Sequence, residues 1–464
     1  MTRLVELLLL ALSPFVSEAR AMETIEPRLS SASPGVVIIA FGEPATANSL
    51  AFQQDGTIAL AVSGRIAGSG RALLLRVAPD GRLADHPATV VGDITMSASN
   101  VAVAPDNRTV LIGSGYAPRA AANEQSRADF MVARFLPDGT PDRGFAREGW
   151  TLTDVGELKD HDEPYAVAVQ PDGKIVVTGS SNVRYWLIMR AYSFATVRYD
   201  RDGSLDKTFG DRGRAITRMG VSREDRANTI LIQPDGKIVA GGSADSNRAD
   251  RNAAADFALA RYLPDGRLDA SFGDSGRAGP TGLGVLSNIL STTALDTSGR
   301  IVVGGKTTVS NDRPRSQSSA FAPLLARYAA NGSLDRSFGK SGFVMLDPGP
   351  LVLAAERSDD EKISSVAIDS QGRIVAVGNV RHKECGLCAA VLRFNPDGGL
   401  DPSFAAAGFF LMPFAQGYRV AIQQDGKLVV LGKQPYRRGE TAGIVLVRLI
   451  PDGTPDPTFG PAPP

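Results

Sequence analysis

The chain has 464 residues, of which 43% are hydrophobic, and its 50 basic residues balance its 50 acidic residues. This balance argues against a nucleic-acid partner, which needs a basic surface, and the hydrophobic content excludes a disordered chain. The 49 glycines and 29 prolines indicate many short strands joined by turns.

The first residues have the composition of an export signal. An apolar run at residues 4–12 follows a basic residue and precedes a small-x-small sequence at residues 19–21. We expect residues 1–21 to be a signal peptide and residues 22–34 to be a flexible linker, so that the mature chain is periplasmic or extracellular. An acidic residue inside the run leaves a buried or disordered N-terminal helix as the alternative. The run is too short to cross a bilayer, so we expect no membrane insertion after signal cleavage.

The first strand pattern along the chain is GVVIIAFG at residues 35–42. From residue 51 onward, seven copies of a hairpin pattern follow, each with a strand, a turn such as Pro-Asp-Gly and an apolar strand that ends in glycine. The clearest copies are AVQPDGKIVVTG at residues 168–179 and LIQPDGKIVAGG at residues 231–242. In such turns proline presets φ, aspartate bonds nearby backbone and glycine takes the left-handed conformation.

A second hairpin pattern alternates with the first and contains one arginine in each of seven copies, as in RYLPDGRLDASFG at residues 261–273. Two hairpins in each unit give four strands, and seven such units in succession are typical of a seven-bladed β-propeller. Independent modules would need linkers between the repeats, and the sequence shows none. The repeated arginines are Arg76, Arg134, Arg198, Arg261, Arg327, Arg393 and Arg448.

The last repeat ends differently from the others. Internal copies are followed by an outer strand, such as GRAITRMG at residues 213–220, whereas the seventh copy stops at residues 458–460. The strand at residues 35–42 stands before the first repeat and would complete the last blade. The sequence therefore predicts an all-β fold at residues 35–464, a single seven-bladed β-propeller with four antiparallel strands per blade. The N-terminal strand closes it in the last blade, so that no sheet edge is exposed.

Two strings carry a resemblance to a known family. QPDGKIVVTG and LARYLPDGRLDASFGDSG resemble the delta-60 repeat, which is found in tandem in exported bacterial proteins and is expected to form propeller blades. The resemblance covers nearly all of residues 35–460 and implies a scaffold role for the motif residues, with no shared catalytic activity. The first repeat departs from the pattern, because residues 82–91 lack the Ser-Phe-Gly string, which leaves the shape of blade one open.

Each repeated arginine has apolar neighbours on both sides, which places its guanidinium between packed blades. A buried arginine needs a partner, and an aspartate recurs a few residues later, as Asp269 does after Arg261. We predict a bidentate arginine–aspartate pair that joins strands three and four of each blade, because a functional site seldom recurs around a whole ring. The aspartates are Asp142, Asp206, Asp269, Asp335, Asp401 and Asp456, with Asp85 as an offset copy in the first repeat.

Two groups of residues resemble metal sites, and both have a plainer interpretation. Asp200, Asp202 and Asp206 match part of a calcium loop, but calcium takes more oxygen ligands, and a plain turn is favoured. Cys385 and Cys388, the two cysteines, could bind zinc with a nearby histidine, but no fourth ligand is evident. In an exported chain a disulfide between them is favoured over free thiols or a metal, so we expect no metal and no cofactor.

Enzymatic propellers usually place acids, histidines or a metal around the central channel, at the ends of the innermost strands. Two rows of residues occupy these positions here, and neither contains a carboxylate or a histidine. The rows are Ser49, Asn100, Ala166, Thr229, Thr292, Ser365 and Arg419, and, one residue earlier, Asn48, Ser99, Tyr165, Asn228, Ser291, Ser364 and Tyr418. Such a mouth lacks a general base or a metal cage, so we predict no catalytic residue. The ligand-binding candidates are Asn48, Asn100, Tyr165, Asn228, Tyr418 and Arg419.

The connections between the repeated hairpins vary in length and sequence and share one face of the predicted propeller. They are residues 116–129, 183–193, 243–256, 307–323 and 353–364. Variable loops on a rigid face usually carry recognition. We predict an exported, non-enzymatic scaffold that binds a protein or a polysaccharide through this face; solvated loops without a ligand are the plainer interpretation. The alternative function is a hydrolase or lyase with catalytic groups on a loop such as residues 158–165, which contain Asp160, His161 and Asp162.

Overall fold

The computed structural model describes the chain from residue 27 to residue 461, with gaps. The expected signal peptide and much of four of the five variable loops lie outside the described residues. The remaining predicted loop, residues 183–193, is corrected, because residues 183–186 and 189–193 belong to two paired strands. The described ranges are 27–31, 33–66, 68–92, 94–116, 127–156, 161–186, 189–220, 224–245, 255–279, 287–309, 320–346, 360–382, 386–412, 416–434 and 443–461.

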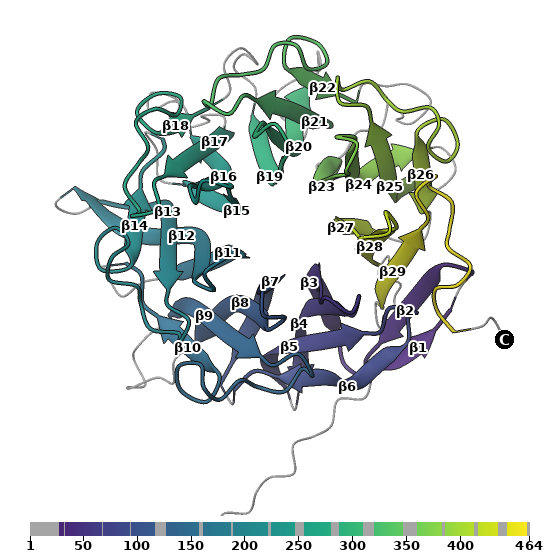
Figure 1. The fold of residues 1–464 in the computed structure, drawn as a ribbon, viewed down its shortest axis with the longest axis horizontal. Coiled ribbons are helices and arrows are strands. Elements are labelled where there is room, and N and C mark those ends of the chain that lie inside the picture. The colour runs from purple at the N-terminus through teal and green to yellow at the C-terminus, as the bar shows by residue number, and fades with distance from the viewer. Residues whose placement is uncertain are drawn as a thin grey trace, which may run out of the picture.

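Seven β-sheets form a closed ring around one axis, and each sheet directs one strand toward the axis and one toward the rim (Figure 1). Six sheets have four strands and one has five, and the paired strands within them are antiparallel. The predicted all-β, seven-bladed propeller is therefore confirmed. The described residues contain no helix, and hence no helix that could span a membrane.

The strands follow one another from the axis to the rim in each blade. Blade one consists of β3 (Ala45–Phe52), β4 (Ile58–Ile66), β5 (Ser69–Val77) and β6 (Leu83–Val90). Blade two consists of β7 (Met96–Val103), β8 (Thr109–Tyr116), β9 (Ala128–Phe135) and β10 (Trp150–Thr153). Blade three consists of β11 (Asp162–Val169), β12 (Ile175–Trp186), β13 (Met189–Tyr199) and β14 (Arg214–Thr217). Blade four consists of β15 (Arg226–Ile232), β16 (Ile238–Asp245), β17 (Ala255–Tyr262) and β18 (Arg277–Ala278). Blade five consists of β19 (Asn288–Leu295), β20 (Ile301–Val309), β21 (Ala320–Tyr328) and β22 (Phe343–Met345). Blade six consists of β23 (Lys362–Ile368), β24 (Ile374–His382), β25 (Gly386–Phe394) and β26 (Phe409–Met412). Blade seven consists of β27 (Gln416–Ile422), β28 (Leu428–Lys433), β29 (Ile444–Leu449), β2 (Val36–Ala40) and β1 (Arg28–Ser30).

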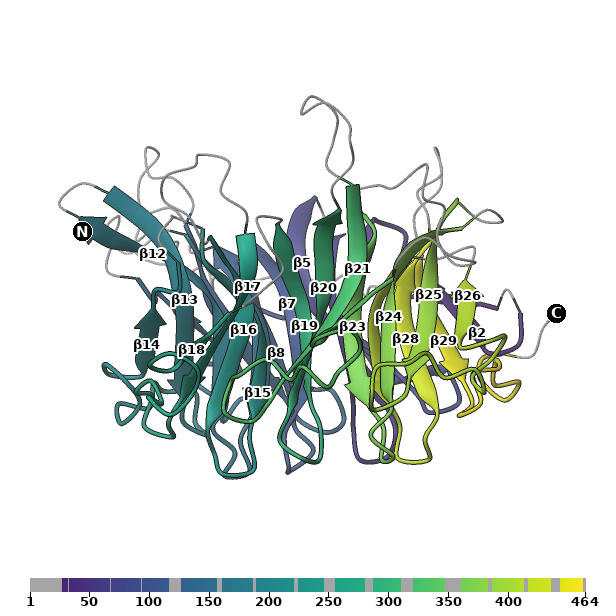
Figure 2. The same cartoon turned by 90° about the horizontal axis from the view of Figure 1, so that it is seen from above.

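The short Asp-Gly turns lie together on one face of the ring, the lower face in Figure 2. In the turn between β11 and β12, the Asp172 carboxylate accepts a hydrogen bond from Lys174 N at 3.0 Å, and Gly173 has a φ of 83°. Asn107 takes the glycine position in blade two, with a φ of 66°. These local contacts place the hairpins where the sequence predicts them and leave the longer connections on the opposite face.

Apolar side chains fill the space between neighbouring blades. Between blades four and five, Val239 and Leu259 pack with Ile301 and Leu324 in one buried cluster. Close approach at the turns depends on glycine: a Cβ added to Gly266 in blade four would lie 2.5 Å from Gly210 N in blade three, which is too close for any other residue. Each blade thus depends on its neighbours for burial.

The N-terminal strand closes the ring as predicted. β2 pairs with β29, from Val36 opposite Val447 to Ile39 opposite Ile444, and Arg448 N donates to Gly35 O at 2.9 Å. Residues 28–30 correct the prediction of a flexible linker at residues 22–34, because they form β1 and pair with β2. Blade seven therefore has a fifth, outermost strand instead of the predicted four.

Blade one is four-stranded although its repeat departs from the pattern. Its outer strand, β6, pairs with β5 from Leu73 opposite Val90 to Val77 opposite Leu83, with a register shift between Leu75 and Val77. The residues that replace the Ser-Phe-Gly string thus belong to an extended outer strand. The shape that the sequence left open is an ordinary blade with a longer rim strand.

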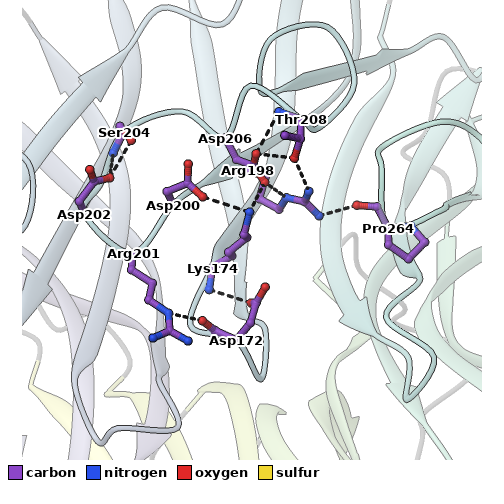
Figure 3. A network of polar contacts seen from close by, with 10 residues as sticks. All are labelled: Asp172, Lys174, Arg198, Asp200, Arg201, Asp202, Ser204, Asp206, Thr208 and Pro264. Atoms are coloured by element: carbon purple, nitrogen blue, oxygen red, sulfur yellow. Dashed lines mark hydrogen bonds and ion pairs between the residues drawn. The ribbon is translucent and has the colours of Figure 1, made fainter.

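The repeated arginines hold the blades together, as the close view of Arg198 shows (Figure 3). Arg198 Nε donates to Asp206 Oδ2 at 2.7 Å, and Nη1 donates to Pro264 O of the next blade at 2.5 Å. The ring of Phe209 lies 4.6 Å from the guanidinium carbon. The predicted arginine–aspartate pair is present, but it is not bidentate, because the second donor binds the neighbouring blade.

Five other repeated arginines make the same contacts, namely Arg134, Arg261, Arg327, Arg393 and Arg448. Arg448 Nη1 binds Pro79 O and so joins the last blade to the first. Arg76 in blade one differs: its Nε donates to Gln53 Oε1 at 3.3 Å, and Asp85 offers only its backbone carbonyl, at 2.9 Å from Nη1. The predicted pairing of Arg76 with the Asp85 carboxylate is therefore wrong.

Candidate functional site

A cavity of about 640 Å³ lies on the axis of the ring, because residues from the innermost strand of every blade line it. Ser97, Glu163 and Lys362 line it from the first two positions of β7, β11 and β23. Ser114 and Tyr116 add the end of β8. The cavity therefore lies at the face that carries the longer connections.

One of the two predicted rows lines this cavity completely. Its members are Asn48, Ser99, Tyr165, Asn228, Ser291, Ser364 and Tyr418. From the other row, Arg419 alone is among the lining residues that the structure describes. Five of the six ligand-binding candidates are thus brought together, and Asn100 is not one of them.

Asn100 joins three neighbouring blades. Its Oδ1 accepts hydrogen bonds from Ser49 Oγ at 2.9 Å and from Val101 N at 2.8 Å, and its Nδ2 donates to Tyr165 O at 3.1 Å. These contacts occupy both ends of the amide. Asn100 therefore supports the strands that line the cavity without lining it itself.

Asn48 and Asn228 combine support with a place in the lining. Asn48 Nδ2 donates to Ala98 O of the next blade at 2.7 Å, and Asn228 Nδ2 donates to Leu290 O of the next blade at 2.8 Å. Each amide nitrogen is thus used between blades, which orients the side chain. The amide oxygens are the atoms that a ligand in the cavity could use as acceptors.

Two tyrosines in the lining are each held by the residue two positions earlier. Tyr165 Oη is in hydrogen-bond contact with Glu163 Oε2, and burial together with Glu163 raises the pKa of Tyr165 to about 12. Tyr418 Oη donates to Gln416 Oε1 at 3.2 Å, and burial and the charge of Asp360 raise its pKa. Both phenols therefore stay protonated at neutral pH and can donate or accept.

Glu163 and Lys362 are lining residues that the sequence interpretation missed. The expected mouth without a carboxylate is thus corrected, because Glu163 supplies one. The signal was present: side chains two apart on a strand share a face, so the residue two positions before Tyr165 faces the channel as well. The two rows chosen from the sequence ended at Tyr165, two residues after it.

Arg419 has only neutral partners. Its Nη1 donates to Ser364 O at 3.2 Å and to Tyr418 O at 3.3 Å, and no ion pair with a carboxylate of the described residues is formed. Burial lowers the pKa of its guanidinium. The cavity thus contains a partly desolvated cation whose charge no described side chain balances.

In the stretch at residues 158–165, the source of catalytic groups in the alternative function, Glu163 and Tyr165 line the cavity, whereas His161 and Asp162 bind nearby backbone. Asp162 is 1% exposed, and its Oδ2 accepts hydrogen bonds from Val155 N at 2.7 Å and Gly156 N at 3.3 Å. His161 Nδ1 accepts a hydrogen bond from Ala128 N at 3.4 Å. Asp160 lies outside the described residues.

Three carboxylates come close together between blades two and three, and they are the group best placed to attract a cation. Asp129, Asp154 and Asp162 each have an oxygen within 4.8 Å of the other two. Burial and the charges of Asp154 and Asp162 raise the pKa of Asp129 to about 6. One oxygen from each carboxylate gives three ligand atoms, fewer than the six or more that calcium takes. The sequence did not reveal the group, because Asp129 and Asp162 come from strands of different blades and Asp154 follows β10.

The aspartates that resemble a calcium loop have separate partners (Figure 3). Asp200 lies 3.1 Å from Lys174 Nζ, Asp202 accepts a hydrogen bond from Ser204 N at 2.9 Å, and Asp206 binds Arg198. The three carboxylates do not converge on one point. They form the plain turn that the sequence favoured.

The cysteine pair is described in part. Cys388 is buried on β25, with its Sγ 3.8 Å from Val380 O. Cys385 lies outside the described residues, so the disulfide between them stays a prediction. His382, the third residue of the possible zinc site, is 7% exposed at the end of β24.

Comparison with protein families finds propeller repeats in this chain. Residues 170–209, 233–272, 297–338, 370–404 and 423–459 match the family described as "Domain of unknown function (DUF5122) beta-propeller". Residues 152–186 match the WD domain, G-beta repeat. No curated protein sequence matches the chain. The chain is therefore built from β-propeller repeats.

Solved structures with a similar overall arrangement have very different sequences. A protein of unknown function from Dyadobacter fermentans is 12% identical, with 76% of this chain and 96% of that chain covered and a TM-score of 0.43. The polysaccharide lyase Uly1 is 12% identical, with 87% and 90% covered and a TM-score of 0.49. An α-L-arabinanase from Penicillium chrysogenum, complexed with arabinobiose, is 9% identical, with 92% and 100% covered and a TM-score of 0.47. Similarity at this level carries no information about the ligand or reaction of this chain.

Proposed function

We propose that this protein is a non-enzymatic binding scaffold that holds a polysaccharide, or a fragment of one, in its axial cavity. The observation that carries the proposal is the convergence of amide and phenol side chains from separate blades, namely Asn48, Tyr165, Asn228 and Tyr418, on one cavity. Sugars present hydroxyl groups in several directions, which amides and phenols can satisfy, and tyrosine rings add flat apolar surfaces.

The described surface supports a polysaccharide over a protein as the ligand. Stable protein interfaces have an apolar core with aromatic anchors. Among the described residues, the exposed large hydrophobic side chains are Ile216, 39% exposed, and Met345, 44% exposed. They lie on the rim strands of blades three and five, so they form no patch beside the cavity.

Isothermal titration with a panel of neutral and acidic oligosaccharides tests the proposal. Wild type should bind at least one of them, and Tyr165→Ala and Tyr418→Ala should each weaken that binding about tenfold, which corresponds to about 1.4 kcal/mol. Met345→Ala, a change at the exposed rim, is the control and should bind like wild type. The proposal is wrong if no saccharide binds, or if the control loses as much affinity as the tyrosine variants.

A hydrolase or lyase is the second candidate, favoured by the contact between Glu163 and Tyr165 in the cavity. A carboxylate beside a phenol puts a possible base and a possible acid in one site. An enzyme of this kind would cleave the saccharides that it binds, and Glu163→Gln would abolish cleavage. That variant reproduces the Gln416–Tyr418 pair of blade seven and should fold normally. Binding by wild type without any new chain ends would support the scaffold.

We also infer that the repeats are delta-60 repeats and that the chain is exported after loss of residues 1–21. The quoted repeat strings and the apolar run at residues 4–12 support these points. N-terminal sequencing of protein recovered from periplasmic and extracellular fractions tests export. We expect an exported chain that begins at residue 22. An intact N-terminus, with the protein found only in the cytoplasm, would overturn the proposed export.

A further inference from the structure

Arg419 stands in a row of residues that otherwise serve the scaffold. The equivalent positions in blades one and five bind the neighbouring blade: Ser49 Oγ donates to Asn100 Oδ1 at 2.9 Å, and Thr292 Oγ1 accepts a hydrogen bond from Val366 N at 3.2 Å. Other members of the row are small or neutral. Arg419 is the one charged residue in the row, and the one member of the row that lines the described cavity.

Buried arginines elsewhere in this chain show what a structural arginine looks like. Arg198 is 6% exposed and meets the Asp206 carboxylate at 2.7 Å, while its Nη1 donates to Pro264 O of the next blade and its Nη2 donates to Thr208 Oγ1. Arg419 has hydrogen bonds from Nη1 alone, and both acceptors are neutral carbonyls. A guanidinium has five N–H donors, so most of its binding capacity is available to a ligand.

An arginine of this kind is costly unless an anion meets it. Arg419 is half-buried, so its charge loses part of its hydration, a penalty that a counter-charge would offset. The described residues supply no carboxylate partner to Arg419, and burial lowers its pKa without any opposing acid. The folded protein alone therefore gains little from this charge, which points to an anion that arrives with the ligand.

Charge in the cavity is divided between opposite sides of the ring. Lys362 lines the cavity from β23 and Arg419 lines it from β27, whereas Glu163 lines it from β11, across the axis (Figure 1). The side of the cavity formed by blades six and seven also has an acid nearby, because the charge of Asp360 raises the pKa of Tyr418. Among the described residues, however, no acid pairs with Arg419. An anionic group would be attracted to blades six and seven and repelled by blade three.

We propose that the ligand of the axial cavity carries an oxyanion, a carboxylate or a sulfate ester on a saccharide, and that Arg419 binds it. The planar guanidinium matches such groups with two parallel hydrogen bonds. This proposal rests on the proposed function, because it names the class of saccharide that the same cavity takes. It makes Arg419 the residue that decides between acidic and neutral saccharides.

The experiment compares oligogalacturonate with its methyl ester, which differs in charge and hardly in shape, and with a sulfated oligosaccharide of the same length. Titration should show at least tenfold tighter binding of one acidic form than of the ester. Arg419→Gln should remove most of that preference, because it should weaken binding of the acidic form far more than binding of the ester. Lys207→Gln, an equal charge change at an exposed turn residue, should keep the preference. Comparison of the affinities for oligogalacturonate and for the sulfated oligosaccharide shows whether a carboxylate or a sulfate ester is preferred.

Arg419→Lys is the control for a folding defect in Arg419→Gln, because it keeps the positive charge and loses only the paired hydrogen bonds. It should retain part of the preference for the acidic form, with a melting temperature equal to that of Arg419→Gln. Equal binding of the ester and both acidic forms by wild type, or equal losses for all three ligands in Arg419→Gln, would overturn the proposal.

Thermal melts with and without sulfate ion distinguish a failure of this proposal from a failure of the proposed function. If no saccharide binds, the proposed function fails, and the anion site stands only if sulfate raises the melting temperature of wild type more than that of Arg419→Gln. If the ester binds as well as the acids, the saccharide cavity stands and the anion site fails. If neither sulfate nor any saccharide has an effect, both are wrong.

Discussion

An arginine that is buried or half-buried among the blades serves one of two purposes in this molecule, and its partner decides which. Arg261 donates to Asp269 at 2.9 Å and to Ala330 O of the next blade at 2.5 Å, with the ring of Phe272 4.5 Å from its guanidinium carbon. Every part of that side chain is bound within the ring of blades. Arg419 instead meets two backbone carbonyls beside a cavity, so scaffolding does not account for its charge.

Arg261→Ala should lower the free energy of unfolding by about 3 kcal/mol, because it leaves the buried Asp269 carboxylate with only the more distant Lys237 Nζ, 3.4 Å away, and removes the bond to Ala330 O of the next blade. The control is Arg267→Ala, which breaks a 2.8 Å pair with Asp265 whose side chains are 76% and 45% exposed. That loss should stay below about 0.5 kcal/mol, since surface pairs contribute little. Urea unfolding of the two variants measures the difference. Equal losses would show that Arg261 acts as a surface residue.

The stability of the ring should depend on pH through the same aspartate. Burial alone would raise the pKa of Asp269, but hydrogen bonds from Ser271 and Lys237 and the charge of Arg261 lower it to about 2. Aspartate in an unfolded chain titrates near pH 4, so this contribution is complete above about pH 4 and is lost as the pH falls to about 2. Urea unfolding across this range should show a steeper loss for wild type than for Asp269→Asn. Parallel curves would contradict the assignment.

Residue contacts could be predicted from the sequence where they are local. Asp269 follows Arg261 within one hairpin, so repetition alone identified the pair, whereas the bond to Ala330 crosses to the next blade and has no signal in the sequence. Glu163 was missed because only two rows of the channel were considered. Asp129 and Asp162 meet across two blades, a contact that the spacing within one repeat does not encode.

Strands were predictable wherever turn residues such as Asp-Gly lie next to a segment in which apolar and polar residues alternate. The Asp-Gly turns located the hairpins, and the missing outer strand of the last repeat indicated that β2 completes it. β1 was missed because three residues with polar ends carry no alternation. β6 was left open because its sequence departs from the repeat, and its pairing with β5 is decided by that neighbouring strand.

Deleting residues 22–42 from a chain that begins at residue 22 should cause aggregation or a large fall in melting temperature. The deletion removes β2 and exposes the apolar edge of β29, and exposed edges recruit other chains. Deleting residues 22–33 removes only the three residues of β1 among the described strands and should have a small effect. Light scattering and thermal melts of the two deletions provide the measurement. A chain lacking residues 22–42 that melts like wild type would show that β2 does not close the ring.

Closure of the whole ring creates the cavity. The first and last blades are joined by the bond from Arg448 to Pro79 O and by Gly460 N, which donates to Asp80 O at 2.7 Å. Because every blade contributes to the lining, the cavity exists only when all of them are in place. Repetition thus accounts for the scaffold, and the places where the repeats differ, such as Tyr165, Tyr418 and Arg419, account for the chemistry of the mouth.

A crystal structure of the protein with the saccharide that binds it most tightly tests the central claim most directly. The ligand should occupy the axial cavity, in contact with Tyr165 and Tyr418, with any oxyanion beside Arg419. The same crystals without ligand are the control for bound solvent or buffer molecules. A saccharide found on the Asp-Gly turn face or along the rim strands, with the axial cavity free of it, would contradict the account.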